Sequence, residues 1–210
     1  TGGMGIRIDN TNDYIQGVTI NGEAHQAFAD QMVILPNLKQ GVNKITINLG
    51  SRPSSDLRLT YVSKIMPSIK KNGNRIETEL LTKSKAKFSF NVEKPAILLN
   101  ADYQDWNWKD DNILKGFVTS DRTIVLAELE MSDFFISKAT LPIVDYKVSD
   151  SQISLQMDSN DSVAEIWFQS ENSPKKVMLG NNQLNISSEN HNYKLEIPSF
   201  SNTETLTISF

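Results

Sequence analysis

The chain has 210 residues, of which 39% are hydrophobic and 22% charged, so it carries enough apolar material for packed cores and is not expected to be disordered. Its formal net charge of −4 gives no basic field for nucleic acid, and no apolar run reaches the ~18 residues that membrane insertion needs, so neither partner is expected. Cysteine is absent, which excludes disulfides, thiolate metal sites and cysteine nucleophiles.

The first 50 residues predict short strands separated by turns. Residues 5–9 (GIRID) alternate apolar and polar side chains, which is the period of a strand. Asn21 and Gly22 predict a two-residue hairpin turn, because both positions need a positive φ that these residues tolerate. Residues 1–50 are therefore predicted to be a partial β-sandwich module whose leading strands are missing. Because the sequence starts with Thr1 and not Met, we expect an excised fragment.

Residues 57–132 predict a second β-sandwich module. Residues 57–65 alternate as a strand, and the segments 76–81 and 85–92 are predicted to pair as a hairpin. Residues 96–99 (AILL) are apolar enough for a buried central strand.

Residues 141–210 predict a third module, which opens with strands at 146–148, 153–157 and 163–168. Apolar residues nowhere keep helical spacing for more than about a turn, so helix content should be small. Short strands with frequent turn signals favour tandem antiparallel β-sandwich modules. An immunoglobulin-like topology is the first choice and a jelly roll the second.

Short phrases recur along the chain at spacings near 80 residues or twice that value. The matched pairs are VTING with VMLGN (18–22 and 177–181), ITINL with LTISF (45–49 and 206–210), and PAILLN with PKKVML (95–100 and 174–179). Recurrence at such a period indicates a small structural unit that has been copied.

The richest candidate site is the segment 101–112, which reads ADYQDWNWKDDN. The rings of Tyr103, Trp106 and Trp108 could stack on sugars, while Asp102 and Asp105 bind sugar hydroxyls. A second interpretation is favoured for the two tryptophans. They are two residues apart, so on a strand they face the same way, and the repeat matches them with the apolar Leu184 and Ile186. This match predicts that they belong to the core.

The same segment raises a weaker hypothesis of calcium binding by Asp105, Asp110 and Asp111, since Ca²⁺ takes six to eight oxygen ligands. The regular spacing of a calcium loop is missing, so no metal is predicted. Zinc is not expected either, because the only histidines, His25 and His191, belong to different copies. No cofactor is predicted.

Residues 18–49 read VTINGEAHQAFADQMVILPNLKQGVNKITINL. The V-x-I-N-G hairpin and the closing L-x-x-G-x-N-x-I-x-I strand resemble immunoglobulin-like and galactose-binding-like β-sandwich accessory modules of secreted bacterial carbohydrate-active proteins. The last copy departs from this pattern, with Thr203 and Thr205 in place of Gly41 and Asn43. The resemblance implies a non-catalytic region that faces polysaccharide outside the cell or on the bacterial cell surface, and it carries over no binding residue.

Three functions follow as hypotheses. The first is a non-catalytic accessory or structural region of a larger secreted or cell-surface protein, which braces a neighbouring domain of the same polypeptide or holds it against a polysaccharide. The second is a carbohydrate-active enzyme with carboxylates of the segment 101–112 in a cleft between modules. The sequence has no G-x-S-x-G elbow and singles out no acid–base pair, so we do not expect an enzyme. The third is an adhesin or scaffold that binds proteins through a strand edge.

Overall fold

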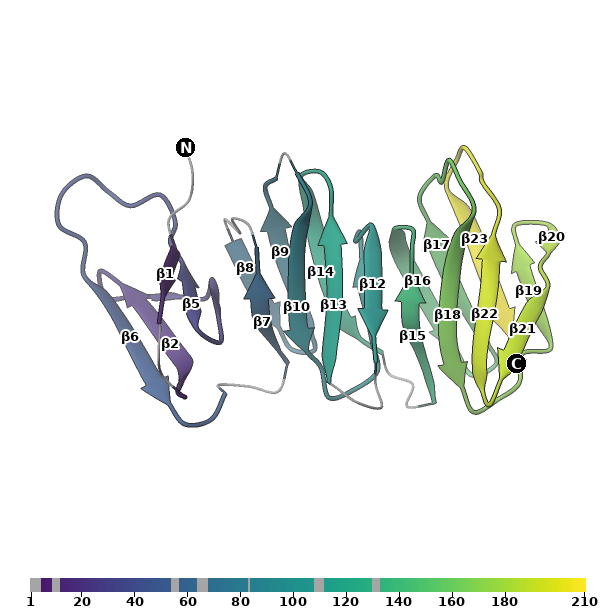
Figure 1. Cartoon of the computed structure of the whole chain (residues 1–210), viewed down its shortest axis with the longest axis horizontal. Helices are drawn as coiled ribbons and strands as arrows, with labels where there is room; N and C mark the ends of the chain where they lie inside the picture. The colour runs from purple at the N-terminus through teal and green to yellow at the C-terminus, as the bar shows by residue number, and fades with distance from the viewer. Residues whose placement is uncertain are drawn as a thin grey trace. The chain divides into compact units, whose positions relative to one another are not determined.

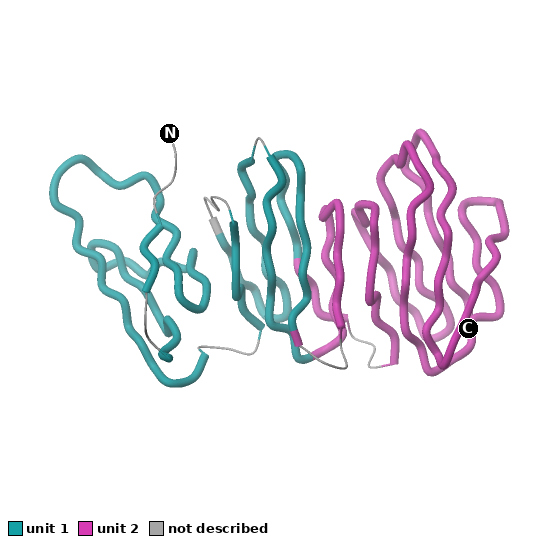
Figure 2. Tube along the Cα trace, viewed as in Figure 1, with its two compact units in different colours: residues 1–93, 113–125 teal, residues 94–112, 126–210 magenta. Residues whose placement is uncertain are grey.

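The computed structural model describes residues 5–8, 12–53, 57–63, 68–82, 84–107, 112–129 and 133–210. Within these ranges the chain forms strands and no helix, and the described sheets are antiparallel (Figure 1). The predicted all-β, antiparallel sandwich class is therefore confirmed. Contacts within the chain define two compact units, which Figure 2 colours separately: unit 1 is Thr1–Glu93 with Ile113–Val125, and unit 2 is Lys94–Asn112 with Leu126–Phe210.

Unit 1 opens with two three-stranded sheets that share one core. One sheet has the order β1 (Gly5–Arg7), β5 (Met32–Ile34) and β4 (Phe28–Ala29), and the other β3 (Glu23–His25), β2 (Tyr14–Ile20) and β6 (Ile45–Gly50). Ile15 and Val18 of β2 are buried in one cluster with Val33 of β5. The two sheets therefore pack face to face, as in a β-sandwich.

The turn between β2 and β3 has the predicted conformation. The φ angles are 54° at Asn21 and 88° at Gly22, so both turn residues are in the left-handed region. The Asn21 side chain also accepts a hydrogen bond from the Lys44 backbone N–H and donates one to the Asn43 side chain, both at 2.9 Å. Asn21 therefore joins the hairpin to the start of β6.

The other strands that lie wholly in unit 1 pair differently from what the sequence predicted at one place. They are β7 (Arg58–Val62), β8 (Ser68–Asn72), β9 (Arg75–Leu80), β10 (Ala86–Asn91) and β13 (Ile113–Val118). The predicted hairpin of segments 76–81 and 85–92 is wrong, because β9 pairs with β8 while β10 lies between β7 and β13.

The loop after β9 explains the error. The backbone N–H of Thr82 donates to the Asp121 carboxylate, and the chain then crosses to the other sheet instead of turning back. Both β9 and β10 bury alternate side chains, including Leu80 and Phe88. Strands in two facing sheets and strands paired in one sheet show the same alternation, so the pattern does not separate the two arrangements.

Unit 2 is a two-layer sandwich. One layer has the order β12 (Tyr103–Trp106), β15 (Phe134–Ala139), β18 (Ala164–Ser170), β22 (Asn192–Ile197) and β21 (Ile186–Glu189). The other has the order β16 (Ile143–Ser149), β17 (Gln152–Met157), β23 (Glu204–Ser209), β19 (Lys176–Leu179) and β20 (Asn182–Gln183). Unit 2 also contains β11 (Ala96–Leu99), which is buried as predicted but is the end strand of its sheet and not a central one. Strand β14 (Arg122–Glu128) spans the boundary between the units.

Aromatic rings form the centre of the unit 2 core. The Phe134 ring of β15 lies 5.3 Å from the Phe168 ring of β18 and 6.3 Å from the Phe210 ring, centroid to centroid. Phe210 follows β23 of the opposite layer, so these contacts hold the two sheets together. The outer face of the layer that contains β18 is left to solvent.

Strand pairings recur in the two units at constant sequence spacing. The pairs Ile69 with Thr78 and Tyr146 with Leu155 are separated by 77 residues along the chain. The order β3–β2–β6 in unit 1 is likewise repeated by β20–β19–β23 in unit 2. The matched phrases thus occupy equivalent places in their sheets. The division into modules 1–50, 57–132 and 141–210 stays a prediction, as does the choice between immunoglobulin-like and jelly-roll topology.

Candidate functional site

The alternation of β12 separates the candidate residues of segment 101–112 into two groups. Tyr103 is half-buried and Asp105 is exposed on one side, whereas Gln104 and Trp106 are each only 2% exposed. The pKa of Tyr103 is raised by burial, and further by the charge of the Asp105 carboxylate and a hydrogen bond to it. Tyr103 and Asp105 therefore form a bonded polar pair, and Asp102 lies half-buried just before the strand.

Trp106 is a core residue and not a surface for stacking sugars. Its ring packs edge-to-face against Phe135, with centroids 5.3 Å apart, and 2% exposure leaves no ring face for a ligand. The interpretation of Trp106 as a core residue is thus correct. Its inclusion among the predicted sugar-binding residues is wrong, because the ring is buried. Trp108, the second ring of that pair, lies outside the described residues.

The metal hypotheses are only partly covered by the structure. Asp110 and Asp111 lie outside the described residues, so calcium binding with Asp105 remains a prediction. In the described ranges no group of three or more histidine or carboxylate side chains is placed to hold a metal. His25 Nε2 lies 2.7 Å from the Ile34 carbonyl oxygen, and His191 is exposed in the β21–β22 turn.

An exposed tryptophan that the sequence analysis did not single out lies at the centre of the outer face of unit 2. In β18 the side chains of Ala164, Ile166 and Phe168 are buried, which turns Glu165 and Trp167 to the other side. Trp167 is 37% exposed. The signal was present in the sequence EIWFQ, because the alternation places this tryptophan in phase with Glu and Gln.

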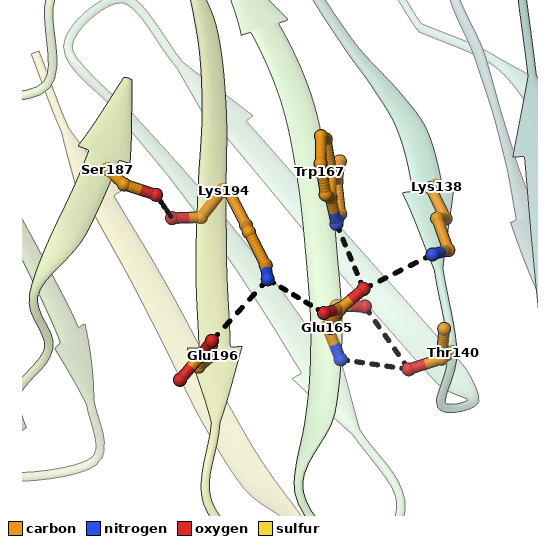
Figure 3. Close-up of polar contacts among 7 residues, drawn as sticks. All are labelled: Lys138, Thr140, Glu165, Trp167, Ser187, Lys194 and Glu196. Atoms are coloured by element: carbon orange, nitrogen blue, oxygen red, sulfur yellow. Dashed lines mark hydrogen bonds and ion pairs between the residues drawn. The ribbon is translucent and has the colours of Figure 1, made fainter. Parts of the chain in front are cut away.

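The Glu165 carboxylate organises the side chains around Trp167. Its Oε2 accepts hydrogen bonds from the Trp167 Nε1–H and from Lys138 Nζ, both at 3.2 Å, and its Oε1 lies 2.8 Å from Lys194 Nζ (Figure 3). The backbone N–H of Glu165 also donates to Thr140 Oγ1 at 2.8 Å. One carboxylate therefore positions an indole and two ammonium groups from three adjacent strands.

These bonds change the protonation of Glu165. Hydrogen bonds from Lys194, Lys138 and Trp167, in decreasing order of effect, lower its pKa from the ordinary 4.5 to about 2. The hydrogen bond to Glu165 in turn raises the pKa of Lys194. Glu165 is thus ionised at neutral pH with its oxygens engaged. A general acid needs a raised pKa, so this carboxylate is unsuited to that role.

The strand register aligns polar side chains in one row with Trp167. Each is the direct cross-strand partner of the next, and we call them the Trp167 row: Asp105 (β12), Lys138 (β15), Trp167 (β18), Lys194 (β22) and Ser187 (β21). Neighbouring strands lie ~4.8 Å apart, so the row extends over about 19 Å.

The Trp167 ring stands between the two lysines of the row. The Nζ atoms of Lys138 and Lys194 lie 5.7 and 5.5 Å from the ring centroid, within the range of cation–π contacts. Figure 3 shows both ammonium groups directed toward Glu165, at one end of the indole. The two ammonium groups are therefore held beside the Nε1 end of the indole by the same carboxylate.

An open groove of about 460 Å³ adjoins the ring. We call it the Trp167 groove, and it is lined by Trp167, Ser187, Ser188, Glu189, Asn190, Asn192 and Lys194. Its end is formed by the β21–β22 turn, where φ is 50° at Asn190 and 63° at His191. Asn192 fixes this turn by donating to the carbonyl oxygens of Glu189 and Asn190, both at 3.2 Å. The groove thus combines one aromatic surface with hydroxyl and amide groups.

No model of a known protein family matches the chain, and no curated protein is significantly similar to it in sequence. In the described ranges there is also no helix long and apolar enough to cross a membrane.

Proposed function

We propose that the chain is a non-catalytic β-sandwich region that binds a carbohydrate chain at the Trp167 groove. The observation that carries this proposal is a partly exposed tryptophan, fixed by Glu165, beside a groove whose lining includes hydroxyl and amide groups together with one acidic and one basic side chain. A sugar ring has an apolar face that fits an aromatic surface, and its hydroxyl groups need both donors and acceptors. The groove offers all three.

The partial exposure of Trp167 gives up stabilising free energy, and a role in binding would explain this. Burying a Trp side chain removes ~150–250 Å² from water, which stabilises a fold by several kcal/mol at ~25 cal/mol per Å². Trp167 forgoes part of that gain, whereas Trp106 obtains it. An aromatic side chain held on the solvent side of a sheet is therefore available for a ligand.

A protein partner fits this surface less well. The centres of protein–protein interfaces are depleted of charge and rich in apolar area. Trp167 is instead surrounded on the sheet by the ion-paired side chains of Lys138, Glu165 and Lys194. The scaffold hypothesis is for this reason the second choice.

The wider context of the proposal comes from the sequence. The resemblance of residues 18–49 to accessory modules favours a region of a larger secreted or cell-surface bacterial protein. The copied β-sandwich unit would hold the glycan near a neighbouring domain. Catalysis would then belong to another part of such a protein, since Glu165 is unsuited to acid–base work and the exposed Asp105 lies at the far end of the row.

Titration of the purified chain with soluble cell-wall and plant polysaccharides tests the proposal. Binding should shift the tryptophan fluorescence, and Trp167→Ala should abolish both the shift and the affinity measured by calorimetry. Tyr61→Ala is the matched control, because Tyr61 is an exposed aromatic residue on β7 of unit 1. Failure of every polysaccharide to bind would overturn the proposal. Release of reducing ends by the chain would contradict its non-catalytic part.

A further inference from the structure

We infer that the Trp167 groove selects a neutral glycan over an acidic one, and that the glycan lies across the strands along the Trp167 row. The inference rests on the proposed function and names its ligand class. Charge, hydrogen-bonding groups and strand register of unit 2 each support it.

The outer sheet of unit 2 has an excess of negative charge. The charged residues of its five strands are two lysines and four acids: Lys138, Lys194, Asp105, Glu165, Glu189 and Glu196. Two positive against four negative charges leave a formal balance of −2. The groove lining itself holds one charge of each sign, Glu189 and Lys194, so a carboxylated sugar gains no net attraction there and meets a net negative sheet around it.

The two lysines are not available to attract a carboxylated sugar. Lys194 is 2.8 Å from Glu165 Oε1 and 3.4 Å from Glu196 Oε1, and Lys138 is 3.2 Å from Glu165 Oε2. An acidic sugar would have to compete with carboxylates that are already in place. Glu189 also lines the groove itself, so a second carboxylate would meet a like charge there.

The uncharged groups of the groove suit hydroxyls instead. Ser187, Ser188 and Asn190 are exposed, and their side chains can both donate and accept hydrogen bonds. Sugar hydroxyls have the same dual character. Ser187 makes only a long bond, 3.4 Å to the Lys194 carbonyl oxygen, which a ligand can replace at little cost.

The strand register sets the direction in which a bound glycan lies on the sheet. The groove covers the Trp167, Lys194 and Ser187 part of the row, and the row continues past Lys138 to Asp105 and its bonded neighbour Tyr103. A short oligosaccharide fills the groove alone. A longer one extends across β15 to β12, where Asp105 accepts a hydroxyl hydrogen bond.

The test compares neutral oligosaccharides of glucose, mannose, galactose and xylose, from disaccharide to hexasaccharide, with galacturonic acid oligomers of the same lengths. We expect binding of a neutral series with an affinity that is unchanged by salt, since no ionic contact is made. Affinity should rise with length. Asp105→Ala should weaken the hexasaccharide about threefold, the effect of one lost exposed hydrogen bond, and leave the disaccharide unchanged.

A charge variant provides the matched control. Glu196→Gln, at an exposed residue outside the groove lining, removes one of the four negative charges and should leave neutral binding intact while improving affinity for the acidic oligomers. Binding of acidic oligomers alone, weakened by salt, would overturn the inference and keep the proposed function. Neutral binding that does not depend on length or on Asp105 would overturn the direction across the strands. Binding of neither series to the intact chain would count against the proposed function itself.

Discussion

The indole Nε1–H of Trp167 donates a hydrogen bond to the Oε2 atom of Glu165, two residues earlier on the same strand, at 3.2 Å. The same oxygen accepts a bond from Lys138, and the other carboxylate oxygen holds Lys194. The ring therefore has a fixed orientation before any ligand arrives. Preorganisation of this kind lowers the entropic cost of binding.

Replacement of Glu165 by Gln should weaken binding without unfolding the chain. The neutral amide loses both ion pairs, so the ring and the lysines become mobile. We expect about a three- to tenfold rise in Kd, measured by calorimetry, and a loss of stability below about 1 kcal/mol, because the pairs are partly exposed. Glu196→Gln, which removes only the 3.4 Å contact to Lys194, is the control. Equal effects of the two changes would contradict the role given to Glu165.

The stability that Glu165 contributes should depend on pH in one window. Its folded-state pKa is lowered from 4.5 to about 2, so the contribution is fully present above 4.5 and is lost as the pH falls toward 2. The difference in denaturation midpoint between the chain and its Glu165→Gln variant should thus be constant near neutral pH and shrink across that window. Chemical denaturation at a series of pH values measures it. A difference that changed near neutral pH, or not at all, would contradict the assignment.

Truncation of Trp106 should be among the most damaging single changes in unit 2. Trp106→Ala removes a side chain that is 2% exposed and packed on Phe135, so we expect a loss of about 3–5 kcal/mol in the free energy of unfolding. Trp106→Phe should cost less, because the aromatic contact is kept. Tyr61→Ala on an exposed site should stay within about 0.5 kcal/mol. Equilibrium denaturation compares the three, and a mild effect of Trp106→Ala would mean that this site is not core.

Substitution of Gly22 in the hairpin turn of unit 1 should destabilise the fold through backbone conformation and not through a steric clash. A Cβ at Gly22 would meet no atom within 4 Å, but φ is +88°, so Gly22→Ala should destabilise by about 1 kcal/mol through strain alone. Gly17→Ala in β2 is the control, since its Cβ would make an ordinary contact of 3.8 Å with Asn48 and the strand conformation suits alanine. Thermal denaturation of both variants should show a loss only at Gly22.

Local patterns in the sequence were sufficient to predict where strands and turns form and which side chains of a strand are buried. The alternation of residues 164–170 determines which side chains enter the core, and Asn21 with Gly22 determines a hairpin, because both depend on backbone geometry within a few residues. The core position of Trp106 was predicted by the repeat match with Leu184 and Ile186, and not by alternation. The alternation of residues 165–169 indicated that Trp167 is exposed, but the denser aromatic segment 101–112 was favoured as the site.

Strand partners and the site were decided only by the tertiary structure. Residues 76–81 and 85–92 have the alternation of a hairpin, yet they lie in different sheets. Two strands that pair in one sheet and two strands that face each other across a core both show a period of two, so the sequence pattern is the same. Lys138 reaches Glu165 from 27 residues away, and no local pattern joins the two. Side-chain periodicity is a property of a single strand. Which strands pair with it depends on how the loops connect the strands and on how the two sheets pack around a common core.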